Sequence, residues 1–179
     1  FSEGFEDASA LACWQKFNCE SETGRTTGSA ATGNACFSFH WSTNPPQYLI
    51  SPELSNTDEG VKVTFQYKEY NSSFPETFQV GYSLTNDSAA SFVWGEEVNN
   101  VTESYQTFEA IYPANTKYVA IKYTSNNMYY LYIDDINFML PPACMPVSGL
   151  YADDITANGA TLHWTAPEGQ SSFIVRLDS

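Results

Sequence analysis

The chain has 179 residues, of which 42% are hydrophobic and 16% aromatic, so it has enough apolar side chains for a folded core and is not disordered as a whole. Its 21 acidic and 7 basic side chains give a formal net charge of −14, which disfavours nucleic acids and anionic membranes as partners, because both carry phosphate charge. No apolar run approaches the roughly 20 residues of a membrane span, so membrane insertion is not expected. Residues 1–6 do not have the pattern of a signal peptide.

The first part of the chain is rich in loops. Residues 18–34 consist mainly of Gly, Ser, Thr and Ala and show no alternation of polar and apolar residues, which predicts a long loop. Loops of this length in compact domains often carry function or bind ions.

Three of the four cysteines, Cys13, Cys19 and Cys36, lie in or beside this stretch, and Cys144 lies far from it. A disulfide between Cys13 and either Cys19 or Cys36 is the most plausible pairing, with free buried cysteines as the alternative, because connectivity cannot be deduced from spacing. No Cys-x-x-Cys pair occurs and the two histidines are distant in sequence, so a zinc site is not expected.

The middle of the chain alternates polar and apolar residues with the period of a β-strand, while helical periodicity is almost absent. Alternating runs over 61–68, 77–84 and 119–124 each predict a strand with one buried face, and the more continuous apolar run over 130–138 predicts a strand in the middle of a sheet. Turn-forming residues separate these runs. Several short strands at such spacing predict an all-β sandwich.

A domain boundary is expected at 140–146, where Pro141, Pro142 and Pro146 cannot continue a central strand. The first domain then covers 1–141. After the boundary, apolar patterns around 147–155, 160–164 and 173–177 predict about three strands. Three strands leave one apolar face without a partner sheet, so residues 142–179 are expected to begin a second, immunoglobulin-like sandwich that is truncated here.

Several segments of residues 1–140 follow an order that resembles one domain family. They are Phe5-Glu6, Trp14, Tyr48-Leu49-Ile50-Ser51-Pro52-Glu53-Leu54, Val63-Thr64-Phe65-Gln66-Tyr67, Phe78-Gln79-Val80-Gly81-Tyr82-Ser83 and Tyr130-Leu131-Tyr132-Ile133-Asp134-Asp135-Ile136-Asn137-Phe138. This order resembles the cleaved-adhesin and choice-of-anchor J domains of Bacteroidetes surface proteins, including the haemagglutinin modules of gingipains; MAM domains are more distantly similar. The tail, with Ala160-Thr161-Leu162-His163-Trp164, looks like the start of a fibronectin type III domain.

The resemblance implies a jelly-roll sandwich, similar to galactose-binding and carbohydrate-binding modules. It also implies a secreted or cell-surface module that recognises a glycan or a host extracellular protein and belongs to a longer chain with further domains. The alternative is a non-catalytic spacer or accessory domain of a larger secreted enzyme. The gingipain modules have an Asp/Gly-rich segment after the first tryptophan, and residues 19–24 of this chain carry fewer carboxylates.

A structural calcium site is the first candidate site. It consists of Glu6, Asp134 and Asp135. Related modules place an acidic residue on the first strand and another on the last, and Glu6 and Asp134 match those positions. Asp134 alternates with Tyr132 and Ile136, so its carboxylate points to a largely apolar face, where it needs a partner or a metal ion. Asn34 or a carbonyl of the 18–34 loop can complete the shell. The alternative is that the two aspartates bind backbone amides.

A surface of exposed aromatic residues is the second candidate site. Its candidate residues lie in predicted loops or at strand ends, where binding residues concentrate. They are Trp41, Tyr70, Phe74, Trp94 and Tyr129. We expect Trp41, Tyr70 and Trp94 to bind ligand, and Trp14 and Trp164 to be core residues, which is the more common role of tryptophan.

No catalytic residues are expected. The chain has two histidines and no Gly-x-Ser-x-Gly element for a nucleophilic triad. It also lacks the glycine-rich motifs that bind phosphates. The many acidic residues make chance carboxylate pairs common, so they do not indicate a glycosidase.

Overall fold

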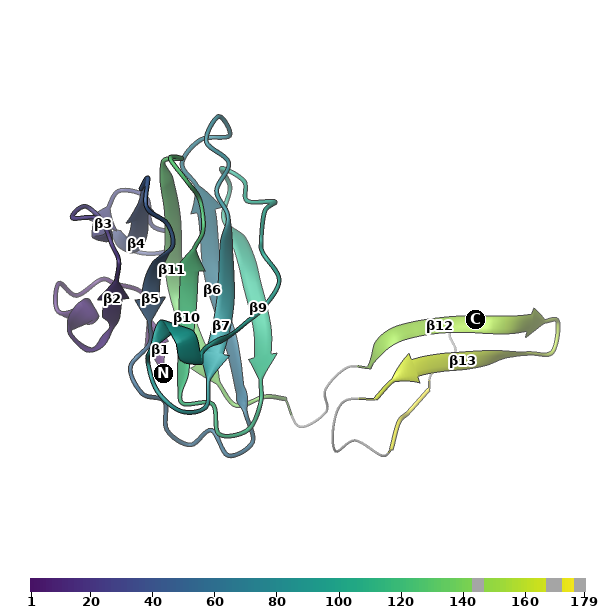
Figure 1. The fold of residues 1–179 in the computed structure, drawn as a ribbon. Helices are drawn as coiled ribbons and strands as arrows, with labels where there is room; N and C mark the ends of the chain where they lie inside the picture. The colour runs from purple at the N-terminus through teal and green to yellow at the C-terminus, as the bar shows by residue number, and fades with distance from the viewer. Residues whose placement is uncertain (143–146, 167–171, 176–179) are drawn as a thin grey trace. The chain divides into compact units, whose positions relative to one another are not determined.

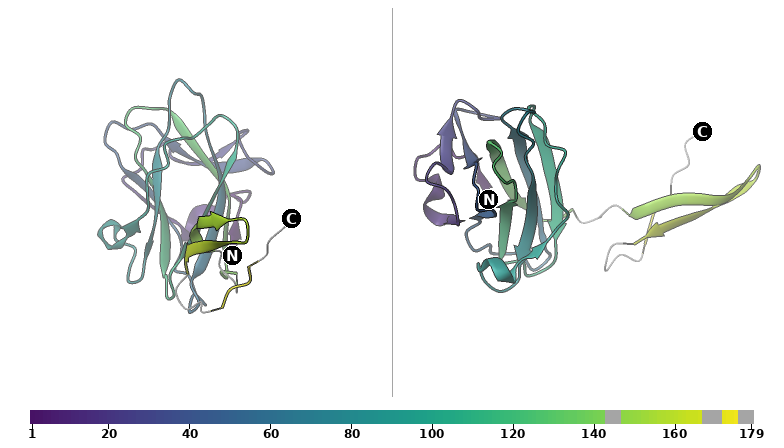
Figure 2. Two further views of the ribbon diagram at one scale, coloured as in Figure 1. Left: turned by 90° about the vertical axis from the view of Figure 1, so that its right-hand side faces the viewer. Right: turned by 45° about the horizontal axis from the view of Figure 1, so that its top comes forward.

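The computed structural model describes residues 1–142, 147–166 and 172–175, and the chain divides into two compact units, Phe1–Leu140 and Pro141–Ser179. The first unit consists of two antiparallel sheets packed face to face (Figure 1). Figure 2 shows these two layers from other directions. The predicted all-β, two-sheet sandwich is confirmed.

We call the six-stranded layer sheet A and the five-stranded layer sheet B. Sheet A has the order β3 (Gly24–Thr27), β4 (Ala35–His40), β11 (Tyr130–Met139), β6 (Val61–Glu69) and β9 (Gln106–Tyr112), with β1 (Ser2–Glu3) also pairing with β11. Sheet B has the order β2 (Gln15–Phe17), β5 (Gln47–Ile50), β10 (Tyr118–Tyr123), β7 (Phe78–Ser83) and β8 (Val93–Trp94). Two short 3₁₀ helices, η1 (Ala10–Cys13) and η2 (Ala89–Ser91), lie in the connections.

The core between the sheets follows from the alternation in the sequence. Along β6 every second residue is buried, from Val61 to Glu69. Fully buried apolar side chains of this kind contribute about 1.5–3 kcal/mol each. The largest of them between the sheets are Tyr123, Phe5, Phe37, Phe39, Phe65, Phe78, Leu49, Leu131, Ile133 and Ile136. Ile50 is buried in a separate small cluster with Phe92 and Ala120. Trp14 is buried as expected, and its indole Nε1 has no hydrogen-bond partner among the described residues.

The outer face of sheet A positions the residues considered below. Because Phe37, Phe39, Leu131 and Ile133 pack in the core, the residues that alternate with them point away from it. These are Ser38 and His40 on β4 and Tyr130, Tyr132 and Asp134 on β11. The pairing of β11 with β6 shifts register between Asp134 and Asn137, where Asp135 has a positive φ of 51°.

Two expectations for the first part of the chain are wrong. Residues 18–34 are not one loop, because β3 lies inside this stretch and pairs with β4; its Thr-rich sequence suits an edge strand although it does not alternate in polarity. Cys13, Cys19 and Cys36 are free thiols, so neither expected pairing of Cys13 is found. Cys13 is exposed at the end of η1, whereas Cys36 is buried in β4 and the Cys19 thiol contacts the Tyr48 carbonyl at 3.4 Å. Cys144 lies outside the described residues.

The second unit contains an antiparallel hairpin of β12 (Ser148–Thr156) and β13 (Gly159–Thr165). Trp164 is half-buried and packs against Phe173, with ring centroids 5.6 Å apart. The predicted third strand is not found at residues 172–175, and Leu177 lies outside the described residues. The small two-stranded sheet alone is not an immunoglobulin-like sandwich. Within the part of the chain that the structure describes, no helix is long and apolar enough to cross a membrane.

Candidate functional site: an aromatic cluster at one end of sheet A

An aromatic cluster lies where three neighbouring strands of sheet A begin or end. Trp41 follows the end of β4, Tyr130 starts β11 and Tyr70 follows the end of β6. Because β4, β11 and β6 are adjacent and antiparallel, these ends lie at the same edge of the sheet. A backbone hydrogen bond of 3.0 Å, donated by the Tyr70 amide to the Tyr130 carbonyl, ties two of them together.

Tyr129 is the centre of this aromatic cluster, which consists of His40, Trp41, Tyr70, Phe74, Tyr129 and Tyr130. The ring centroid of Tyr129 lies 4.8 Å from that of Tyr70, 5.5 Å from that of Phe74 and 4.6 Å from that of Tyr130. His40 connects Trp41 to the others, with centroid distances of 5.7 Å to Trp41 and 4.8 Å to Tyr130. These spacings are those of interacting aromatic pairs.

The outer rings of the cluster are open to solvent. Tyr70 is 52% exposed, Phe74 40% and Trp41 39%. Polar groups lie beside the rings: the Glu22 carboxylate is 3.0 Å from the His40 Nε2, and Asn71 and Ser72 follow Tyr70 directly. The arrangement therefore offers flat apolar faces next to hydrogen-bonding groups, which is the usual composition of a ligand site.

A buried carboxylate holds the centre of the cluster in place. Glu76 is fully buried, and its Oε1 accepts a 2.7 Å hydrogen bond from the backbone amide of Tyr129. Its Oε2 accepts another of 2.7 Å from the hydroxyl of Tyr123. Burial raises the pKa of Glu76, and the nearby carboxylate of Glu69, itself buried, raises it further. The position of Tyr129 thus depends on a carboxyl group whose burial favours its protonated form.

Replacing Glu76 by Gln is expected to remove a loss of stability that the wild type undergoes as the pH rises. The folded-state pKa of Glu76 lies above its ordinary value of 4.5, so the native protein takes up this proton more readily than the unfolded chain. The resulting stabilisation is present at acid pH and is lost as the pH rises through the folded-state pKa. Glu76→Gln should therefore gain free energy of unfolding relative to the wild type as the pH is raised above 4.5.

Urea unfolding at a series of pH values measures this difference. Glu59→Gln is the matched control, because Glu59 is exposed in a turn. A gap between wild type and Glu76→Gln that stays constant across the pH series would contradict the assignment.

Trp94 lies apart from the aromatic cluster, on the outer face of sheet B. It packs on Phe92 at 5.2 Å and Tyr48 at 5.8 Å, and the Lys122 ammonium lies 5.2 Å from its ring centroid. Gly81 of the next strand lies so close that an added Cβ would be 2.6 Å from the Trp94 ring. The structure therefore brings Trp41 and Tyr70 together but not Trp94, which is half-buried against its own sheet.

The four residues expected to hold calcium do come together around the loop that connects β3 to β4. Both carboxylate oxygens of Glu6 accept the Asn34 amide, at 3.0 and 3.1 Å, and Oε1 also accepts the Ala35 amide. Asp134, which is fully buried, accepts the Ala31 amide at 2.7 Å. Asp135 accepts the Thr32 hydroxyl at 2.8 Å. The carboxylates thus fix the path of this loop.

In this structure the oxygens of these carboxylates face N–H and O–H donors rather than a shared centre. Among the described residues, no three Asp, Glu, His or Cys side chains are grouped so that they could hold a metal ion. Hydrogen bonds to the backbone amides of Ala35 and Asn34 lower the pKa of Glu6. This arrangement corresponds to the alternative in which backbone amides satisfy the acidic residues.

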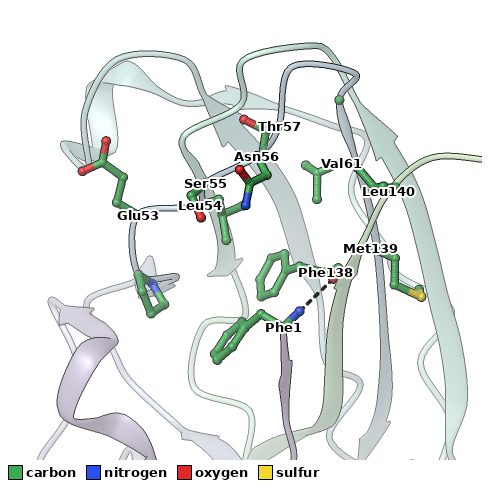
Figure 3. Close-up of a pocket in the computed structure, with 12 residues that line it drawn as sticks. Phe1, Glu53, Leu54, Ser55, Asn56, Thr57, Val61, Phe138, Met139 and Leu140 are labelled. Atoms are coloured by element: carbon green, nitrogen blue, oxygen red, sulfur yellow. Dashed lines mark hydrogen bonds between the residues drawn. The ribbon is translucent and has the colours of Figure 1, made fainter.

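A groove of about 520 Å³ lies at the other end of β6 and β11 (Figure 3). Its walls come from residues 52–57, the start of β6 and the end of β11. Phe1 stacks on Phe138 at 5.7 Å, and the Phe1 amine donates a 3.1 Å hydrogen bond to the Phe138 carbonyl. None of the site residues expected from the sequence lines this groove.

Two residues of the aromatic cluster, His40 and Tyr130, were not expected there. Tyr130 stands in an apolar run that predicts a central strand, and this run hides the alternation between Leu131 and Ile133 on one face and Tyr130 and Tyr132 on the other. The Tyr129-Tyr130 pair at the start of the strand is the sequence signal that could have identified Tyr130. No local pattern marks Glu76, because its role depends on Tyr123 and Tyr129.

The fold and the site define a non-catalytic β-sandwich binding module. The model of the Cleaved Adhesin Domain family matches residues 2–138, and the chain belongs to this family. No protein of curated function matches the chain in sequence.

Solved structures share the sandwich. The K1 cleaved adhesin domain of Lys-gingipain from Porphyromonas gingivalis W83 is 23% identical with a TM-score of 0.65, and the match covers 79% of this chain and 98% of that one. The K2 domain of Lys-gingipain is 24% identical with the same TM-score, covering 78% and 98%. The CBM22-2 xylan-binding domain of Paenibacillus barcinonensis Xyn10C is 11% identical with a TM-score of 0.58, covering 79% and 99%. At these identities the likeness concerns the fold alone.

Proposed function

We propose that this chain is a glycan-binding module of a secreted or cell-surface protein, and that the aromatic cluster is its contact surface. The observation that carries the proposal is the group of exposed rings around Tyr129. Single exposed apolar residues are ordinary on protein surfaces, whereas contiguous ones mark interaction sites. Aromatic faces pack against the C–H faces of sugar rings, and the neighbouring carboxylate and amide groups are suited to sugar hydroxyls.

Two solved structures with the same fold are described with glycan ligands, which supports a glycan over a protein as ligand. One is the xylan-binding domain described above, and another is TmCBM61 in complex with β-1,4-galactotriose, which is 13% identical with a TM-score of 0.57 and covers 77% of this chain and 94% of that one. Within this chain we assign the contacts to Trp41, Tyr70, Phe74 and Tyr129. Trp94 is left out, because it packs against Gly81 and Phe92.

A glycan and extracellular-matrix array tests the function. The wild type should retain at least one glycan, and Trp41→Ala and Tyr129→Ala should each weaken that binding by about thirtyfold, because truncating a central aromatic residue at an interface costs about 2 kcal/mol. Trp94→Ala is the matched control: it removes the same kind of ring from the other sheet and should leave the binding unchanged if the variant stays folded.

Other outcomes of the array favour other functions. Retention of a matrix protein but no glycan would favour recognition of a host protein by the same rings. If the chain binds nothing on the array, a spacer or accessory domain of a larger secreted enzyme would be favoured. Binding that survives the loss of both Trp41 and Tyr129 would refute the site.

We propose separately that Glu6, Asn34, Asp134 and Asp135 hold a structural calcium ion, with the loop amides turned away from the carboxylates. Because a ligand that prefers the native state raises the melting temperature by mass action, calcium should raise the melting temperature relative to chelator. The rise should be lost in Asp134→Asn. Equal melting temperatures with calcium and with chelator would contradict a structural ion and leave the loop amides as the partners of these carboxylates.

We further propose that residues 142–179 begin a fibronectin type III-like domain of a longer chain with additional domains, while residues 1–141 form a jelly-roll domain. Support comes from the apolar residues exposed on the hairpin: Ile155 is 74% and Leu150 62% exposed. A longer natural chain that contains this segment tests the proposal. Amide exchange on β12 and β13 should be slower in the longer chain than in this one, because further strands cover the hairpin. Equal exchange rates in the two chains would contradict the proposal.

A further inference from the structure

Strand β9 forms a long edge of sheet A (Figure 1). It has seven residues and pairs with β6 alone, in a register without a shift from Tyr67 opposite Gln106 to Val61 opposite Tyr112. The other terminal strands of the two sheets are shorter, with four residues in β3, three in β2 and two in β8.

Exposed edges of this length are usually blunted by lysine, proline or a bulge. The sequence of β9, Gln-Thr-Phe-Glu-Ala-Ile-Tyr, contains neither lysine nor proline, and its pairing shows no bulge. Its one charged residue, Glu109, is bound to Lys62 of the neighbouring strand at 2.7 Å. Among the described residues, the outward-facing backbone groups of β9 have no partner strand, so they can pair with another strand.

A groove lies directly beside this edge, between the two sheets. It has a volume of about 420 Å³ and is bordered by β9 on one side and by residues 95–100 on the other. Phe108, Ala110 and Tyr112, the inward-facing residues of β9, are only half-buried, although the corresponding residues of β6 are fully buried. The remaining walls are Tyr67 and Val80. The sandwich is thus incompletely filled where sheet A ends.

We propose that β9 binds an extended basic peptide of a partner protein, which adds a strand to sheet A and places an apolar side chain in this groove. Main-chain hydrogen bonds to a sheet edge supply affinity, and a pocket beside the edge selects alternate side chains. The groove volume falls in the range of about 300–1,000 Å³ of ordinary ligand pockets. This site is separate from the aromatic cluster and does not depend on the proposed glycan function.

Charge decides between a foreign peptide and a second copy of this chain. Glu96 and Glu97 border the groove, and Glu109 lies on the strand itself. Pairing β9 with β9 of another copy would bring these carboxylates near their equivalents, between two molecules that each carry a net charge of −14. A peptide that carries lysine or arginine meets Glu96, Glu97 and the net negative charge of the chain favourably, whereas Glu109 is already paired with Lys62.

The experiment uses a fluorescent peptide of nine residues in which lysine and valine alternate around one central phenylalanine. We expect saturable binding to the full chain. Alternate backbone amides of the bound peptide point toward β9, and the others point to solvent. N-methylation of the amides that face β9 should abolish binding. N-methylation of the other amides should leave binding unchanged. Replacing the lysines by glutamates should weaken binding at least tenfold.

Ala110→Trp fills the groove and should weaken binding at least tenfold. Phe17→Ser, on the edge strand β2 of the other sheet, is the control and should not change it. Hydrogen exchange gives a second readout that does not depend on the variants: the bound peptide should slow exchange at the outward-facing amides of β9. Binding that tolerates N-methylation on either edge, that survives Ala110→Trp in a folded variant, or that leaves exchange on β9 unchanged would overturn the proposal. So would self-association of the chain through β9.

Discussion

Replacing Phe39 by alanine is expected to lower the free energy of unfolding by about 3–5 kcal/mol, the cost of truncating a buried phenylalanine. Phe39 is fully buried in β4, stacks on Tyr123 of the opposite sheet at 5.3 Å and meets Phe37 edge to face at 5.0 Å. It therefore joins sheet A to sheet B, and its loss leaves a cavity between them. Urea unfolding of the wild type and the variant measures the difference.

Phe17→Ala is the matched control for this prediction. Phe17 is 58% exposed on the edge strand β2, so its truncation should change stability by less than about 0.5 kcal/mol. Similar losses in the two variants would contradict the view that the core between the sheets, rather than aromatic content in general, stabilises the fold.

Asp134→Ala is expected to cost about 2–4 kcal/mol, because it removes a fully buried carboxylate that accepts several backbone hydrogen bonds. The Asp134 carboxylate accepts the amides of Ala31 and Asp135, at 2.7 and 2.8 Å, and a longer bond of 3.3 Å from Thr32. Without it these part-buried amides lose the acceptor that they share. Urea unfolding measures the loss, and amide exchange at 31–35 should accelerate in the same variant.

Asp135→Asn, at the neighbouring residue, is the control for Asp134→Ala. Asparagine keeps an oxygen for the Thr32 hydroxyl and tolerates the positive φ of this position, so stability should change by less than about 0.5 kcal/mol. If Asp134→Ala were as stable as the wild type, the carboxylate would not be the anchor of the loop.

The alternation of apolar residues was sufficient to predict the sandwich. The runs around Val63, Phe65 and Tyr67, and around Ile121 and Tyr123, each bury one face, as the period of a strand requires. The pairing order could not be predicted, because it depends on contacts between distant segments, such as β4 with β11. The edge strand β3 was missed for the same reason: it is recognisable by its partner β4 and not by its own sequence.

The candidate site could be predicted in part. Trp41 and Tyr70 stand next to turn-forming residues, which indicates exposure, and the structure places them in one cluster. Trp94 stands in a similar local context, yet Gly81 on the neighbouring strand gives its ring a surface on which to pack. No local pattern distinguishes these cases, because the difference lies in which strand is adjacent in the sheet.

Mapping of glycan contacts by nuclear magnetic resonance tests the central claim most directly. The isotope-labelled chain is titrated with the glycan retained most strongly on the array, and amide shifts are followed. The account predicts that the largest changes fall at residues 40–42, 70–74 and 129–130, with Trp94, Tyr48 and the strand β9 unaffected. Saturable shifts centred on sheet B around Trp94, or on the groove around Phe138, with none at the aromatic cluster, would contradict it.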